Sequence, residues 1–178
     1  MDAYSIGALI GAGVGLLIGL VLVVILYKFA NKNKKLKTEY DERQKILRGE
    51  GYKYGFYAMF IYSGINTILG VANISLPMEP AVLGFTYIMV GAMVDVAYCI
   101  FHDCYWGQNN DRKKYLIVFA VVGLINAAAF IRALSVGAAI YEGRLSSPGI
   151  NLFCAILMIF LAICLGIKSI IDKKEAAE

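Results

Sequence analysis

Five apolar segments, each about as long as a membrane-spanning helix, constrain this chain more than any other feature. A helix needs about 20 apolar residues to cross a hydrocarbon core of about 30 Å. No segment holds more than one charged side chain, and none has the alternating pattern of a half-buried strand. We therefore expect an all-α fold, a polytopic transmembrane helical bundle with five spans that forms a single membrane domain over residues 1–178. The predicted spans are 6–27, 56–76, 81–101, 115–140 and 150–167.

The composition supports a membrane protein and excludes several other classes. Hydrophobic residues make up 60% of the chain and charged residues only 17%, against about half and about a quarter in soluble domains. A soluble globular enzyme, a disordered chain and a nucleic-acid-binding module are therefore excluded. The net charge of +4 indicates loops that face anionic lipid. Three of the four cysteines lie in predicted spans, so a disulfide framework is not expected.

Lysine and arginine in the loops predict the orientation of the spans, because basic loops stay in the cytoplasm. The first loop, the third loop and the C-terminal tail are basic, whereas the second loop has no base and the fourth has only Arg144. The sequence therefore predicts an outside N-terminus, a cytoplasmic C-terminus and a multi-pass protein of the plasma membrane. A cleaved signal peptide is not favoured, because no base precedes the first apolar segment and Lys28 follows it. The cytoplasmic bases are Lys28, Lys32, Lys34, Lys35, Lys37, Arg43, Lys45, Arg48, Lys53, Arg112, Lys113, Lys114, Lys168, Lys173 and Lys174.

The first span carries a glycine at every fourth position, namely Gly7, Gly11, Gly15 and Gly19. Such a stripe of small residues lets the backbone of another helix approach closely. The partner is left open: it is either another helix of this chain or the same helix of a second copy, which would give a homo-oligomer.

Polar side chains inside three of the spans are candidates for function, because lipid cannot satisfy them. At 1.5 Å per residue, Asn66 and Asn126 lie roughly 15 Å from the cytoplasmic boundary and Asp95 about 9 Å. Asn73 and Arg132 lie roughly 25 Å from it, close to the outer boundary. We therefore expect two polar layers, one of Asn66, Asp95 and Asn126 and the other of Asn73 and Arg132.

Each of these residues has a structural interpretation beside the functional one. The asparagines are suited to hydrogen bonds between helices, and Arg132 to snorkelling toward the outer headgroups or to contact with Glu79 or Glu142 there. Asp95 is harder to explain structurally, because a short carboxylate cannot reach the headgroups. Two interpretations of Asp95 stay open, a neutral structural group and a site for a cation or proton.

The charge and apolar pattern of residues 32–54 predicts a cytoplasmic amphipathic linker between the first two spans. Thr38 followed by Asp41 resembles a capping box, and Gly49 with Gly51 is expected to end a short helix. Such a helix would lie at the headgroups. The alternative is a solvated charged linker.

Two stretches of this chain carry a resemblance to a known family. The first joins Asp41-Glu42-Arg43-Gln44 to Arg48-Gly49-Glu50-Gly51-Tyr52-Lys53-Tyr54-Gly55-Phe56, and the second joins Tyr98-Cys99-Ile100-Phe101-His102-Asp103-Cys104-Tyr105 to Asn109-Asn110-Asp111-Arg112-Lys113-Lys114. Together they resemble a family of small uncharacterised polytopic membrane proteins of Gram-positive (Firmicutes) gut bacteria, with a DERQ-type motif before the second span. Such proteins tend to accompany helix-turn-helix regulators, so the resemblance implies a role in regulation and no particular activity.

The motifs of common catalytic sites are missing from the sequence. There is no P-loop, no HExxH, no Cys-x-x-Cys and no Gly-x-Ser-x-Gly. His102 is the only histidine, and its neighbours Asp103 and Cys104 lack the further ligands that zinc requires, so His102 is expected to cap a helix or lie at the interface. We expect no enzyme activity, no catalytic residue, no cofactor and no metal.

Two functions remain from the sequence. The first is a non-enzymatic integral membrane protein, a sensory, regulatory or immunity-type component that acts through helix–helix contacts and a membrane or cytoplasmic protein partner. The alternative is a small oligomeric channel or carrier for a cation or proton, in which Asp95 would line a hydrated path with Asn66 and Asn126. The expected surroundings are the lipid bilayer, without nucleic acid.

Overall fold

The structure is a computed structural model that describes residues 39–107 and 112–176, together with scattered positions between 10 and 25. For residues 112–115 only the backbone is described. The chain divides into two compact units, Met1–Thr38 and Glu39–Glu178. The described residues of the first unit are helical, within the predicted span 6–27. The rest of that span, Gly7 and Gly19 included, and the linker up to residue 38 lie outside the described residues.

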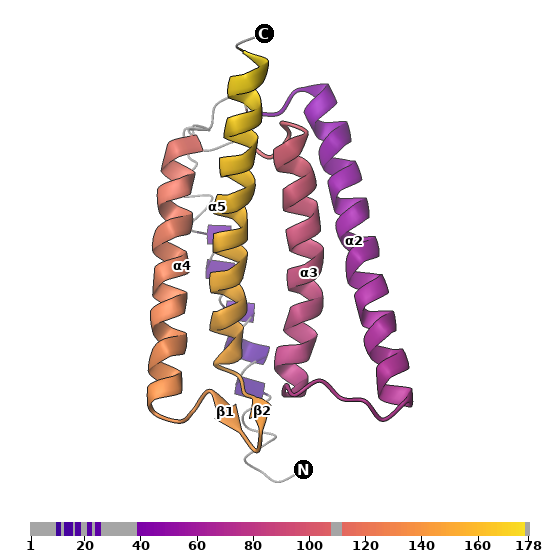
Figure 1. Ribbon diagram of the computed structural model, residues 1–178, viewed down its shortest axis with the longest axis vertical. Coiled ribbons are helices and arrows are strands. Elements are labelled where there is room, and N and C mark those ends of the chain that lie inside the picture. Colours follow the sequence, from indigo (N-terminus) through magenta and orange to yellow (C-terminus); the bar gives the residue numbers. More distant parts are fainter. Residues whose placement is uncertain are drawn as a thin grey trace. The chain divides into compact units, whose positions relative to one another are not determined.

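The described residues of the second unit form four long helices and one short hairpin (Figure 1). Helix α2 packs against α3, α3 against α5, and α5 against α4, so the order of the helices in space differs from their order in the chain. The bounds are α2 Glu42–Val71, α3 Pro80–Phe101, α4 Arg112–Ser135, β1 Ile140–Tyr141, β2 Arg144–Leu145 and α5 Gly149–Glu175.

Three helices in the described part of the chain are long and apolar enough to cross a membrane: α3, the Leu116–Ser135 part of α4, and α5. The helical, multi-pass character predicted from the sequence is therefore confirmed at this coarser level. Few large apolar side chains are buried within the unit, where Ile100, Leu161 and Cys164 form a small core. Many others are exposed, such as Phe60 at 68% and Leu124 at 71%, as expected where lipid takes the place of a protein core.

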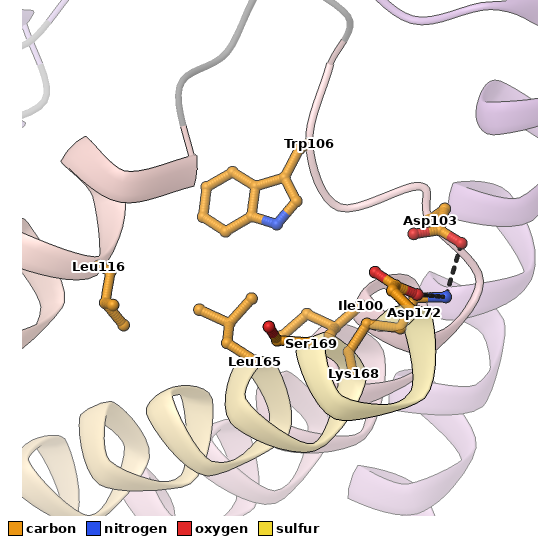
Figure 2. Close-up of a pocket in the computed structure, with 8 residues that line it drawn as sticks. All are labelled: Ile100, Asp103, Trp106, Leu116, Leu165, Lys168, Ser169 and Asp172. Atoms are coloured by element: carbon orange, nitrogen blue, oxygen red, sulfur yellow. Dashed lines mark ion pairs between the residues drawn. The ribbon is translucent and has the colours of Figure 1, made fainter. Parts of the chain in front are cut away.

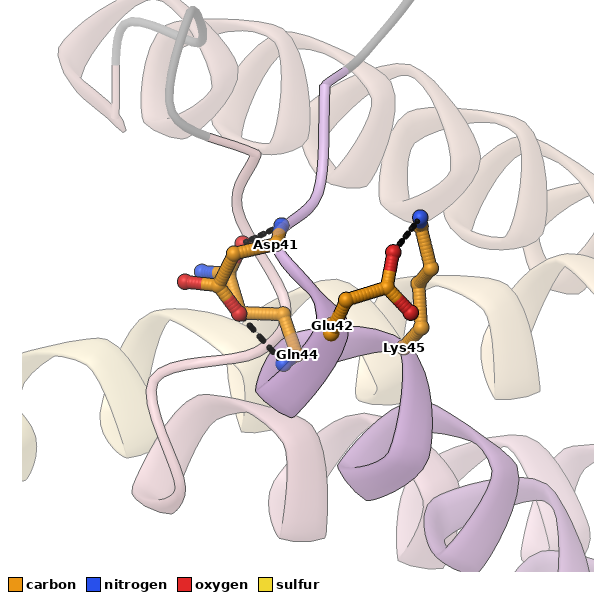
Figure 3. A network of polar contacts seen from close by, with 4 residues as sticks. All are labelled: Asp41, Glu42, Gln44 and Lys45. Carbon is orange, nitrogen blue, oxygen red and sulfur yellow. Dashed lines mark hydrogen bonds and ion pairs between the residues drawn. The ribbon is translucent and has the colours of Figure 1, made fainter.

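Helix α2 differs from the prediction at its beginning. The expected separate helix that ends at Gly49 and Gly51 is wrong, because one helix runs from Glu42 through both glycines to Val71. Asp41 is the N-cap of α2: its carboxylate accepts from the backbone N–H of Gln44 at 2.7 Å, and the Gln44 side chain accepts from the Asp41 N–H at 3.3 Å (Figure 3). Thr38, the predicted cap, lies outside the described residues. A single glycine costs a helix only about 1 kcal/mol, so the long α2 tolerates both.

At three other places the end of a helix differs from the end of the predicted span. The second span was expected to reach residue 76, but α2 ends at Val71 and Asn73 adopts a positive φ of 57°. The fourth span was expected to reach residue 140, but α4 ends at Ser135, and Gly137 follows with a φ of 72°, typical of a residue just after a helix. The fifth span was expected to end at residue 167, before Lys168, and the helix α5 itself continues to Glu175.

The β1–β2 hairpin, which lies between α4 and α5, is hydrogen-bonded to the connection between α2 and α3. The Leu145 N–H donates to the Pro77 carbonyl at 2.8 Å, and the Glu79 N–H donates to the Leu145 carbonyl at 2.9 Å. The Glu79 carboxylate accepts from the backbone N–H and the hydroxyl of Ser147. This fixes the α2–α3 connection to the start of α5.

Candidate functional site

Helices α2 and α3 approach closely at three glycines. A Cβ added at Gly55 would lie 2.7 Å from the Gly91 carbonyl oxygen, and one added at Gly91 would lie 3.0 Å from the Gly55 carbonyl oxygen. Gly51 and Gly55 form a Gly-x-x-x-Gly pair on one face of α2, the spacing that brings helix backbones together in membranes. We call these three glycines the glycine seam. The glycine seam was not predicted from the sequence, because Gly51 was interpreted as the end of a helix.

Asp95 lies directly against the glycine seam. A Cβ at Gly51 would lie 2.6 Å from Oδ1 of Asp95 and 2.8 Å from Sγ of Cys99, so these side chains would have to shift to admit it. The same oxygen accepts a hydrogen bond from the Cys99 thiol at 3.5 Å. Within the part of the chain that the structure describes, Asp95 makes no ion pair, and the nearby Arg48 of α2 donates its hydrogen bonds to the loop after α3 and to Tyr52.

A groove of about 240 Å³ runs between α2 and α3 and has Asp95 at one end. It opens to the outside of the helix pair, and apart from the carboxylate its walls are mainly apolar side chains and glycines. The residues that line it are Tyr52, Gly55, Phe56, Met59, Ile88, Gly91, Ala92 and Asp95. This arrangement presents one carboxylate to whatever lies in an otherwise apolar groove.

The structure does not bring the other predicted polar residues to Asp95. The Asn66 amide donates to the Tyr62 carbonyl at 3.0 Å, and the Asn126 amide donates to the Val122 carbonyl at 2.8 Å, so both bonds stay within their own helices. Asn126 lies on α4, which packs against α5.

The second predicted layer is not assembled either. Arg132 is exposed near the end of α4, and Asn73 is exposed in the connection after α2. Glu79, one of the two partners expected for Arg132, contacts Ser147 instead. Glu142, the other, lies in the hairpin turn with a φ of 48°.

The loop after α3, residues 102–107, is held by the first turns of α2. Gln44 donates from Nε2 to the carbonyls of Asp103, at 2.8 Å, and Trp106, at 3.1 Å. Arg48 donates from Nη1 to the carbonyls of Cys104 and Tyr105 at 3.3 and 3.4 Å, and the Tyr40 hydroxyl donates to Tyr105 as well. We call Tyr40, Gln44 and Arg48 the loop clamp. The two stretches that carry the family resemblance thus contact each other in space.

Arg48 is the central residue of the loop clamp. Its guanidinium lies 4.4 Å from the centre of the Tyr40 ring, within the range of a cation–π contact, and donates to the Tyr52 hydroxyl at 2.8 Å. Partial burial acts to lower the pKa of Arg48, but Tyr40 and Tyr52 outweigh it and raise that pKa. The charge is therefore retained. Part of a signal for this cluster existed in the sequence, since Gln44 and Arg48 are spaced four apart and share one face of α2, whereas Tyr40 precedes the helix.

The end of α3 confirms one prediction. His102 is the C-cap of α3, as expected, and its ring stacks on Tyr98 with 3.9 Å between ring centres. The Tyr98 hydroxyl donates to Glu50 at 2.6 Å, which adds a second polar tie to α2. Among the residues that the structure describes, no group of three His, Cys, Asp or Glu side chains is placed to hold a metal ion.

Cys104 lies buried in the same loop. Burial raises the pKa of its thiol, which keeps it protonated at neutral pH and gives it the low reactivity of a structural cysteine. A nucleophilic role for Cys104 is therefore disfavoured.

On its other side, the loop faces α5. Lys168 of α5 pairs with Asp103 at 2.8 Å and with Asp172 at 2.9 Å, next to a pocket that Trp106 also lines (Figure 2). The loop is thus tied to α2 by hydrogen bonds and to α5 by charge.

No family model, curated protein or solved structure matches this chain.

Proposed function

We propose that the chain crosses the plasma membrane five times, with the N-terminus outside and the C-terminus in the cytoplasm. Three described helices supply spans by length and composition. Residues 56–71 of α2 are proposed as another, since they expose Phe56, Phe60, Ile61, Ile65 and Ile68, which lipid would cover. The apolar segment 6–27 is proposed as the fifth. The basic loops support this orientation.

We propose that the protein is a non-enzymatic membrane component, of a sensory, regulatory or immunity type, that acts by binding a partner membrane protein. The observation that carries this proposal is Asp95 at the end of the α2–α3 groove, in contact with the glycine seam and without an ion pair among the described residues. Asp95 lies about 9 Å inside the proposed cytoplasmic boundary.

The chemistry of the groove defines the partner. An ionisable group at membrane depth is costly unless it is paired or hydrated, and the thiol of Cys99 is a weak donor. The groove is apolar elsewhere and elongated between two helices, a shape suited to a third helix. We therefore propose that its occupant is a transmembrane helix of the partner that carries a lysine or arginine at the depth of Asp95.

A synthetic leucine-rich helix with one lysine at this depth is expected to bind the purified protein in lipid vesicles. The same peptide with norleucine in place of lysine should bind at least about tenfold more weakly, because close charge pairs at interfaces contribute more than about 1.4 kcal/mol. Energy transfer between a labelled peptide and the labelled protein measures both affinities. Asp95→Asn should abolish the preference for lysine without changing the shape of the groove.

Two variants control this experiment. Asn126→Ala changes a polar residue on α4, away from the groove, and should keep the preference for the lysine peptide. Ala92→Leu should fill the groove and weaken the binding of both peptides. Equal binding of the lysine and norleucine peptides would refute the proposed partner helix. Cation or proton flux through the same vesicles that Asp95→Asn abolishes would instead establish the channel or carrier predicted as the alternative.

A further inference from the structure

Two of the four cysteines lie together at the C-terminal end of α3. The helix ends in a Schellman motif, in which Asp103 adopts the left-handed conformation with a φ of 57°. The Asp103 N–H donates to the Ile100 carbonyl at 3.3 Å, and the Cys104 N–H donates to the Cys99 carbonyl at 2.9 Å. The side chains at the last two positions of this motif frequently contact each other, and here the two thiols lie within hydrogen-bonding reach. The backbone at the end of α3 thus holds Cys99 and Cys104 as a thiol pair.

The surroundings of the thiol pair restrict what it can bind. Cys99 is 2% exposed and Cys104 is 0% exposed, so an ion held there keeps no shell of water. Among the side chains that the structure describes, no third His, Cys, Asp or Glu completes a metal site with the pair. Zinc takes four ligands in structural sites, and magnesium and calcium require oxygen ligands. Thiolate ligands select the soft ion Cu(I), for which two thiolates are a sufficient set.

The charges around the thiol pair suit a monovalent cation. Two thiolates and one Cu(I) carry one net negative charge, and Arg48, which donates to the Cys104 carbonyl at 3.3 Å, supplies a positive charge beside it. Burial raises the pKa of the Cys104 thiol, and Arg48 acts in the opposite direction. The hydrogen bond from the Cys99 thiol to Asp95 is long, at 3.5 Å, and a thiol is a weak donor. Its loss on binding therefore costs little.

We propose that Cys99 and Cys104 bind one Cu(I) ion between their two sulfur atoms. Both thiols bind as thiolates, and their two protons pass to solvent as the ion binds, so no oxidation or reduction takes place. The loop of residues 102–107 covers the thiol pair, and the ion enters when this loop opens. The inference goes beyond the proposed partner helix and does not depend on it, because neither cysteine lines the α2–α3 groove.

Competition with the coloured chelator bathocuproine disulfonate tests the proposed site. Cu(I) is added without oxygen to the full chain in a non-ionic detergent, and one Cu(I) per chain should leave the chelator. Cys99→Ser and Cys104→Ser should each lower the affinity at least about 100-fold. Loss of a hydrogen-bond partner of a ligand weakens metal binding about 10- to 100-fold, and loss of a ligand itself should weaken it more.

Cys154→Ser and Cys164→Ser are the matched controls. These cysteines lie about 15 Å apart along α5, too far to share one ion, and either variant should bind Cu(I) like the unmodified protein. A chain with both replaced should still bind one Cu(I), and its X-ray absorption should show two sulfur ligands, a measurement that leaves the thiol pair intact. Full affinity in Cys99→Ser or Cys104→Ser, loss of binding in the chain without the α5 cysteines, or three or more ligands around the ion would overturn the proposal.

Discussion

Gly55→Ala is expected to destabilise the packing of α2 on α3 by about 1–3 kcal/mol, the usual cost of forcing an extra carbon into a packed site. The added Cβ would lie 2.7 Å from the Gly91 carbonyl oxygen and 3.0 Å from the Asp95 Cβ. Both neighbours belong to the backbone or to the stiff base of a side chain, so α2 and α3 must move apart. The free energy of unfolding, measured by titration with a denaturing detergent, gives the loss.

Gly64→Ala is the matched control on the same helix. A Cβ at Gly64 would meet no atom within 4 Å, and alanine is the better helix former by about 1 kcal/mol. This variant should be neutral or slightly more stable than the unmodified protein. Equal stabilities of Gly55→Ala and Gly64→Ala would show that the glycine seam does not hold the two helices together.

Arg48→Ala is expected to release the loop at residues 102–107 from α2. It removes the two hydrogen bonds to the carbonyls of Cys104 and Tyr105 and the stacking on Tyr40. Hydrogen bonds to charged groups contribute about 1.5–3 kcal/mol, so amide exchange in this loop should accelerate at least about tenfold. Hydrogen–deuterium exchange followed by mass spectrometry measures this local opening directly.

Arg43→Ala controls for the loss of a positive charge, because Arg43 is exposed in the same part of α2 and is outside the loop clamp. In this variant the amides of residues 102–107 should exchange at the rate of the unmodified protein. The exchange rate of the loop in Arg48→Lys should lie between those of Arg43→Ala and Arg48→Ala, since an ammonium keeps the charge but not the planar fork of donors. Unchanged exchange in Arg48→Ala would mean that the loop is held by its contacts with α5.

The regular parts of the fold followed from the apolar pattern. The third span was predicted as 81–101, and α3 is Pro80–Phe101, because Pro80 suits the first turn of a helix and the apolar run ends beside His102. The ends that depended on local backbone chemistry were less predictable. Gly51 has the signature of a helix end in the sequence, yet it lies inside α2, where its missing Cβ leaves room for the side chain of Asp95. Such close packing exists only once α3 is in place.

The candidate site was predicted only in part, for a related reason. Asp95 was identified from its depth, because an isolated carboxylate in an apolar run is costly wherever the helices lie. Its neighbours could not be inferred, since the depth of a residue does not say which way its helix faces. Asn66 and Asn126 share the expected level but bond to their own helices. The loop clamp joins residues that are about 60 positions apart in the chain, which no local pattern reveals.

The proposed five-span topology places Asp95 inside the membrane and thereby supports the partner helix, so the sidedness of the chain is the measurement that tests the account most directly. An antibody on intact cells would probe an epitope tag at the N-terminus. A membrane-impermeant maleimide would probe single cysteines that replace Glu142 or Glu175 in a cysteine-free background. The account predicts that the N-terminal tag and the cysteine at 142 react from outside, and that the cysteine at 175 reacts only after lysis. Reaction of the cysteines at 142 and 175 from the same side, or a hidden N-terminal tag, would contradict it.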